Sequence, residues 1–196
     1  MYKTYFILIV LSIINFKCRK SDSIVSPEGS QNLLTNASFE SNGNPSFDRW
    51  SINLREDSIP RYLKFSQDVP PGGGRWSAAI ENPDSFIIVI TSSPIIPKGS
   101  HKYRLSLWAK SNNPNVVAIL NYQCTKDITY GSSIRITDTV WRPYTVTYTT
   151  FDTLTTSDST KVIADSSRFI YIALWTVFSK ERTKTYFDLV TLEQID

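Results

Sequence analysis

Few residues in this sequence have the types and spacing that catalysis requires. A glycosidase needs two carboxylates at a set separation, but most Asp and Glu lie in polar turns, as at 56–57 and 152–158. The only histidine, His101, lies in the turn before an expected strand, and neither a Ser-His-Asp set nor a His or Cys cluster for zinc can be assembled. We therefore expect no enzyme, and a small polysaccharide lyase or hydrolase is only the third possibility.

The aromatic residues suggest a different chemistry, the binding of sugars. The chain has ten Tyr, ten Phe and five Trp. Flat rings stack on the C–H faces of pyranoses, while amides and charged groups bind the hydroxyls. Trp108 and Trp175 alternate with small or polar neighbours, as solvent-facing platforms would, and a place in the core is the alternative for each. Further candidates are Trp76 and Tyr122 for stacking, and Arg104, Asn121, Gln123 and Lys110 for hydroxyls.

The segments that would position these residues have the pattern of β-strands. Between 103 and 110, apolar residues alternate with Arg104, Ser106, Trp108 and Lys110, so one face of the strand is apolar. The region 169–178 alternates in the same way, and convincing helical stretches are missing. We expect eight to ten strands, including 86–91, 116–124, 132–136, 139–149 and 186–193, with one short strand in 51–69 and an exposed loop at 152–161.

Several phrases, in the same order, resemble jelly-roll carbohydrate-binding modules of families 4, 9 and 22, which are galactose-binding-domain-like. They are Asn32 to Glu40 followed by Trp50, Gly74 to Ile80, Gly99 to Lys110, Thr139 to Tyr148, and Tyr186 to Glu193. The resemblance covers residues 31–196. It implies an all-β jelly-roll sandwich of two antiparallel sheets that binds polysaccharide or oligosaccharide without catalysis, and it implies core positions for Trp50 and Trp141.

The same resemblance implies a structural calcium ion where the first strand meets the last. The matching side chains here are Glu40 and Asp188. Calcium accepts six to eight oxygen ligands in a forgiving geometry, so two carboxylates and loop carbonyls could hold it. The sequence departs from the family at Leu189, where a second Asp is usual. Two unrelated surface carboxylates are the alternative.

The first residues have the layout of a secretory signal. Lys3 supplies a positive charge, the run from Tyr5 to Ile14 is almost wholly apolar, and Cys18 follows shortly after it. About ten apolar residues fall short of the roughly 20 that a membrane span needs. We expect residues 1–17 to be a signal peptide, Cys18 to be lipidated as in bacterial lipoproteins, residues 18–30 to be a tether and residues 31–196 to be the domain.

Composition limits the partners. At 41% hydrophobic residues, the 196-residue chain suits one buried core, and its net charge of +3 falls to about +1 without residues 1–17. No basic stripe indicates nucleic acid. We expect a carbohydrate ligand, a membrane contact through the lipid anchor only, and a separate carbohydrate-active enzyme acting nearby, in the bacterial envelope. The alternative function is a surface adhesin or structural lipoprotein that binds protein partners.

Overall fold

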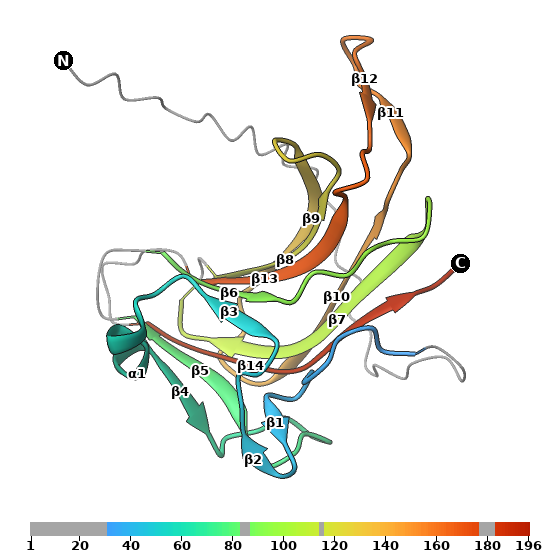
Figure 1. Ribbon diagram of the computed structural model, residues 1–196. Helices are drawn as coiled ribbons and strands as arrows, with labels where there is room; N and C mark the ends of the chain where they lie inside the picture. Colours follow the sequence, from blue (N-terminus) through green and yellow to red (C-terminus); the bar gives the residue numbers. More distant parts are fainter. Residues whose placement is uncertain (1–30, 83–86, 114–115, 177–182) are drawn as a thin grey trace, which may run out of the picture.

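Two five-stranded antiparallel sheets pack face to face in the computed structural model, which describes residues 31–82, 87–113, 116–176 and 183–196 (Figure 1). One sheet, with strand order β10-β7-β14-β5-β4, is called the β14 sheet here, and the other, with order β3-β6-β13-β8-β9, is called the β13 sheet. The expected all-β jelly-roll sandwich is thus confirmed. The expected signal peptide, Cys18 and the whole tether (18–30) lie outside the described residues.

The bounds of the elements follow the sequence pattern closely. The β14 sheet contains β4 (Leu63–Ser66), β5 (Ser77–Asn82), β7 (Lys102–Ser111), β10 (Arg142–Thr149) and β14 (Thr183–Gln194). The β13 sheet contains β3 (Trp50–Ile52), β6 (Ile88–Ser92), β8 (Val116–Gln123), β9 (Thr129–Ile136) and β13 (Phe169–Thr176). Outside the sheets are the pairs β1 (Glu40–Ser41) with β2 (Asn44–Pro45) and β11 (Thr153–Thr155) with β12 (Lys161–Ile163), and the short helices η1 (Glu56–Ser58) and α1 (Ile59–Tyr62).

Two segments differ from the expectation. The Thr- and Ser-rich stretch expected to be a loop forms the β11–β12 hairpin, because Leu154 and Val162 pair across it and Val162 is buried. The stretch 51–69 contains two strand segments and a helical turn rather than one short strand. None of the helices among the described residues is long and apolar enough to span a membrane.

The core lies between the sheets and follows from the two-residue period. On β7, Tyr103, Leu105, Leu107 and Ala109 are buried, while Arg104, Trp108 and Lys110 are partly exposed on the other side. Side chains from β13 and β8, including Ile172 and Leu120, complete the core from the facing sheet. The strands therefore present two outer faces, one on each sheet.

The N-terminal part of the domain is joined to the last strand. The amide of Leu33 donates to Leu192 O at 2.8 Å, and the amide of Val190 donates to Ala37 O at 2.9 Å. Trp50 is buried against Phe39, with ring centroids 5.0 Å apart, and its Nε1 donates to Asn36 O. Its expected place in the core is confirmed. These contacts position the segment that contains β1 beside β14 (Figure 1).

Candidate functional site

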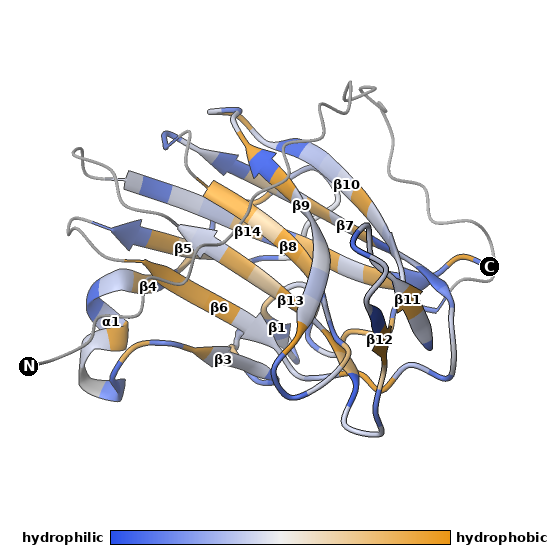
Figure 2. Ribbon diagram, turned by 90° about the horizontal axis from the view of Figure 1, so that it is seen from above, coloured by the Kyte–Doolittle hydropathy of each residue, from blue (hydrophilic) through white to orange (hydrophobic). Residues whose placement is uncertain are grey.

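The outer face of the β13 sheet has a row of aromatic residues. Phe169, Tyr171 and Trp175 alternate along β13 with buried residues, and all three are partly exposed. Ala173, the remaining member of the row, is buried and small. Figure 2 looks down on this sheet and shows hydrophobic residues along its central strands. Successive residues on one face of a strand are about 6.6 Å apart, so the row presents flat apolar surface along the length of β13.

Polar groups flank this row on the neighbouring strands. On β8, Gln123 lies opposite Phe169 and Asn121 lies opposite Tyr171, whereas Val117 lies opposite Trp175. The adjacent strand β9 then places Thr129, Ser133 and Arg135 on the same face. Rings beside amides, hydroxyls and a guanidinium make a surface suited to stacking on sugar rings and binding their hydroxyls.

The rings of the row have different surroundings. Phe169 and Tyr171 are tilted neighbours, with centroids 5.6 Å apart. Burial raises the pKa of Tyr171, so its hydroxyl stays protonated near neutral pH. The Nε1 of Trp175 is buried and has no hydrogen-bond partner among the described residues, although the side chain as a whole is partly exposed. Figure 1 shows β8, β9 and β13 curving away from the β14 sheet, which makes this face concave.

The residues predicted from the sequence to bind sugar lie on two different sheets. Trp175 and Asn121 share the outer face of the β13 sheet, but Trp108 and Arg104 lie on the outer face of the β14 sheet. Arg104 is paired there with Glu193, at 2.5 Å between Nη2 and Oε2. Tyr122 is fully buried, and its hydroxyl donates to Phe151 O at 2.7 Å, so it offers no ring face to a ligand.

Trp76 lies just before β5 and is not part of the aromatic row on β13. It is partly exposed, and its amide donates to Glu40 Oε1 at 2.5 Å.

The binding residues predicted from the sequence did not include Tyr171, Phe169 or Arg135. The alternation of 169–175 could have indicated the two rings, because both share the face of Trp175. Arg135 carries no such signal, since only strand pairing places it on this face.

The outer face of the β14 sheet also has aromatic residues, but they are engaged by charged neighbours. Lys110 Nζ lies 4.6 Å from the ring centroid of Tyr186 and 5.2 Å from that of Trp141, and it forms an ion pair with Asp68. Trp141 Nε1 donates to Asp68 Oδ1 at 2.9 Å. Trp141 is thus not a core residue as expected. It lies before β10, where its indole can reach a surface carboxylate.

Charged residues extend this network along the same face. Lys184 Nζ also lies over the ring of Tyr186, 5.3 Å from its centroid, and pairs with Glu81 at 3.1 Å. Lys64 also pairs with Glu81, at 2.8 Å. The hydrogen bonds from these two lysines lower the pKa of Glu81. This face is therefore held together by its own charges.

Two carboxylates, those of Glu40 at the start of β1 and Asp188 in β14, form a pair where these two strands come together. Asp188 is fully buried at a β-bulge, its Oδ1 accepts from the Leu189 amide at 2.7 Å, and its Oδ2 has no partner among the described residues. Burial, together with the charge of Glu40, raises the pKa of Asp188 to about 7. Glu40 Oε1 accepts from the amides of Arg75 and Trp76.

The turn at Gly72–Gly74, called the glycine turn here, packs directly against both carboxylates. A Cβ atom on Gly73 would lie 2.8 Å from Asp188 Oδ2, and one on Gly74 would collide with Glu40 Oε1. No group of three or more His, Cys, Asp or Glu side chains that could hold a metal occurs among the described residues. A cation here would take two carboxylates and complete its shell with carbonyl oxygens or water, which is a donor set that calcium accepts. The unpartnered buried oxygen fits such an ion.

The fold is that of carbohydrate-binding modules. A family 16 carbohydrate-binding module superposes with a TM-score of 0.55 and 18% identity over 82% of this chain and 99% of that one. A family 61 module, solved in complex with β-1,4-galactotriose, gives 0.53 and 16% over 85% of this chain and 100% of that one. The enzymatically active domain of bacteriophage CBA120 tailspike protein 4 gives 0.54 and 15% over 84% of this chain, but only 21% of that one. No family model and no curated protein matches the sequence.

Proposed function

We propose that this protein binds carbohydrate on the outer face of its β13 sheet. The observation that carries the proposal is the row of partly exposed rings along β13, Phe169, Tyr171 and Trp175, bordered by Asn121 and Gln123. Such a row offers several stacking positions to one chain of sugars, and the amides of Asn121 and Gln123 can bind hydroxyls at the Tyr171 and Phe169 positions. The fold shared with carbohydrate-binding modules supports the same function.

The binding is proposed to occur without catalysis. The carboxylate pair Glu40–Asp188 is the most unusual group of ionisable residues, but Asp188 is fully buried beneath the glycine turn and cannot reach a polysaccharide. His101 contacts Asp196 and the carbonyl of Lys98, away from the aromatic row. A separate catalytic protein would then act on the polymer that this domain holds.

Export and membrane anchoring complete the proposal, and they rest on the sequence alone. The apolar run from Tyr5 to Ile14, followed by Cys18, supports an exported lipoprotein whose acyl chains hold the domain at the bacterial envelope. Residues 18–30 would serve as the tether. Replacing Cys18 with Ala should then release the protein into the soluble fraction, and fatty-acid labelling of the wild type provides the direct test.

Affinity gel electrophoresis on polysaccharides of plant, algal and bacterial origin tests the binding. The wild type should be retarded by at least one polymer, and the Trp175→Ala variant should migrate freely in the same gel. Trp108→Ala is the matched control, because it removes the same ring from the opposite face. Two results would contradict the proposal. In the first, no polymer retards the wild type, which would favour the adhesin alternative. In the second, a polymer retards the wild type and Trp175→Ala, but Trp108→Ala migrates freely.

A further inference from the structure

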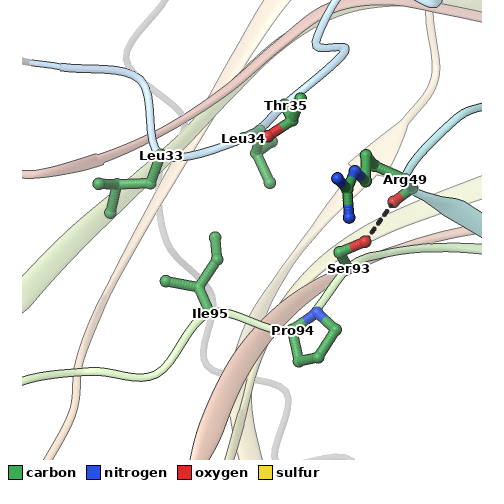
Figure 3. A pocket seen from close by; sticks show the side chains of 7 residues that line it. All are labelled: Leu33, Leu34, Thr35, Arg49, Ser93, Pro94 and Ile95. Carbon is green, nitrogen blue, oxygen red and sulfur yellow. Dashed lines mark hydrogen bonds between the residues drawn. The ribbon is translucent and has the colours of Figure 1, made fainter.

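A cavity that shares no residue with the aromatic row lies where the N-terminal segment passes the end of β6. Its volume is about 320 Å³. Three of its residues come from the segment before β1, one from the turn before β3, and three from the segment after β6. They are Leu33, Leu34, Thr35, Arg49, Ser93, Pro94 and Ile95 (Figure 3).

Arg49 is held in an unusual backbone conformation at the edge of this cavity. Its φ is +69°, in the left-handed region that non-glycine residues seldom adopt. Its carbonyl accepts two hydrogen bonds from Ser93, one from the amide at 2.8 Å and one from Oγ at 3.0 Å. These bonds hold the backbone of Arg49 at the rim, so its side chain starts from a fixed point beside the cavity.

No anionic side chain of the described residues pairs with the guanidinium of Arg49. Figure 3 shows it extending toward the space between Leu34 and Ile95. Within the part of the chain that the structure describes, no hydrogen bond or ion pair satisfies it, in contrast to Arg104 and Arg168, which are paired with Glu193 and Asp152. A planar guanidinium with free donors binds a carboxylate through two parallel hydrogen bonds.

The remaining walls restrict the ligand further. Leu34, Pro94 and Ile95 supply apolar side chains, and the hydroxyls of Thr35 and Ser93 are polar groups in the lining. About 320 Å³ is at the small end of the range for ligand pockets. One cationic side chain among the lining residues matches a singly charged carboxylate better than a doubly charged phosphate, which would need more donors than Arg49 supplies.

We propose that this pocket binds a small carboxylate of about monosaccharide size, with the carboxylate on Arg49 and an apolar ring face against Leu34 and Ile95. A uronic acid has this chemistry, and so does a cyclic non-sugar acid. The proposal rests on the pocket and does not depend on sugar binding by the aromatic row.

The test is a titration of the folded protein followed by the amide signals of its backbone in NMR spectra. Sodium galacturonate, sodium cyclohexanecarboxylate and neutral galactose are the three probes. Galacturonate should shift the amides of Thr35 and Ser93, and galactose should leave them in place. Tighter binding of galacturonate identifies a uronic acid as the natural class, and tighter binding of cyclohexanecarboxylate identifies a non-sugar acid, so both results support the carboxylate site.

Variants separate this pocket from the aromatic row. Arg49→Gln should weaken galacturonate binding about tenfold or more, because it removes a charge-assisted pair. Arg49→Lys keeps the charge but lacks the planar guanidinium, so it should lose an intermediate amount of galacturonate affinity. It also serves as a control for a folding defect in Arg49→Gln. Arg142→Gln, an exposed arginine at the start of β10, should change nothing.

Three results would overturn the proposal. They are equal shifts with galactose, binding that survives Arg49→Gln, or shifts that map to β13 and disappear in Trp175→Ala. The last result would support the aromatic row while removing the pocket. Conversely, a protein that no polysaccharide retards but that binds galacturonate through Arg49 would keep the pocket and remove the aromatic site.

Discussion

The two outer faces of the sandwich both carry aromatic residues, yet they use them differently. On the β14 sheet, Lys110 lies near both Trp141 and Tyr186, and Asp68 binds the lysine and the indole of Trp141. On the β13 sheet, Phe169 and Tyr171 contact each other, and no cation–π contact engages the row among the described residues. Aromatic content alone therefore does not mark a binding face. The marker is a ring whose face has no partner within the protein.

This contrast assigns different roles to the two faces. Changes on the β14 face should lower the stability of the fold and leave carbohydrate binding intact. Changes on the β13 face should weaken binding and leave the melting temperature nearly unchanged.

The largest effect is expected from calcium at Glu40 and Asp188. A cation that binds only the folded state stabilises it by about 2.7 kcal/mol at 100 times the dissociation constant, and by about 4.1 kcal/mol at 1,000 times. The melting temperature of the wild type should rise in millimolar calcium relative to chelator. Calcium should have no such effect on Asp188→Asn, which keeps the shape of the side chain and removes its charge.

The behaviour of this variant without calcium is also informative. In chelator, Asp188→Asn should melt at or above the wild type, since it relieves a buried carboxylate whose Oδ2 has no partner among the described residues. A wild type that melts at the same temperature with calcium and with chelator has no calcium site. The raised pKa of Asp188 would then reflect its burial and the nearby charge of Glu40 without any role in binding an ion.

The next effect concerns the aromatic row. Trp175→Ala should weaken polysaccharide binding by about 1–3 kcal/mol, taking as the scale the stacking of nucleic-acid bases on aromatic side chains. Isothermal titration with a polymer that retards the wild type measures the loss, and Trp108→Ala should bind as the wild type does. If Trp175→Ala unfolds the protein instead, the buried Nε1 side of this indole is structural and Tyr171→Ala becomes the deciding variant.

The pH dependence of stability should expose the Asp188 carboxyl. Its pKa is raised from 3.8 to about 7 in the folded protein, so the folded state binds the proton more tightly than the unfolded state does. The stability from this group is complete below pH 3.8 and is lost as pH rises toward about 7, by at most about 1.4 kcal/mol per pH unit.

Denaturant titrations between pH 4 and pH 8 measure this slope. It should appear in the wild type with chelator and be reduced in Asp188→Asn. Bound calcium favours the charged carboxylate and should flatten the slope above the pH at which the ion binds. A wild type in chelator whose stability does not fall over this range would show that Asp188 ionises normally.

Particular residues show how far the sequence could predict this molecule. The alternation in 103–110 correctly separates buried from outward side chains, because it depends only on the two-residue period of a strand. The same reasoning treats Trp108 and Trp175 alike. It cannot tell that they lie on opposite sheets, since that depends on pairing between β7 and β14 and between β13 and β8.

Long-range packing also explains the other misplaced residues. Tyr122 lies in an expected strand with apolar residues on both faces, and only the position of Phe151, 29 residues away, shows which face is buried. Trp141 was expected in the core by resemblance, but Asp68, 73 residues away in sequence, binds its indole at the surface. The carboxylate pair was located by resemblance, whereas the unpartnered oxygen that fits a cation is visible only in three dimensions.

The smallest effect is expected from the Lys110 network, and it tests the stabilising role of the β14 face directly. Desolvation opposes ionisation of Asp68, but hydrogen bonds from Lys110 and Trp141 lower its pKa overall, so the carboxylate is charged and paired at neutral pH. Lys110→Met keeps the apolar stem and removes the cation from both rings. Cation–π contacts at exposed sites contribute about 0.5–1 kcal/mol, and surface ion pairs contribute less than about 1 kcal/mol.

The Lys110→Met variant should therefore lose about 1 kcal/mol of unfolding free energy in urea and bind polysaccharide as the wild type does. Lys126→Met is the matched control, because Lys126 is 84% exposed and its carboxylate partner, Asp127, lies 4.0 Å away. Its stability should stay within about 0.5 kcal/mol of the wild type. If Lys110→Met instead lost binding and kept its stability, the ligand would contact the β14 face, and the division of roles between the two faces would be wrong.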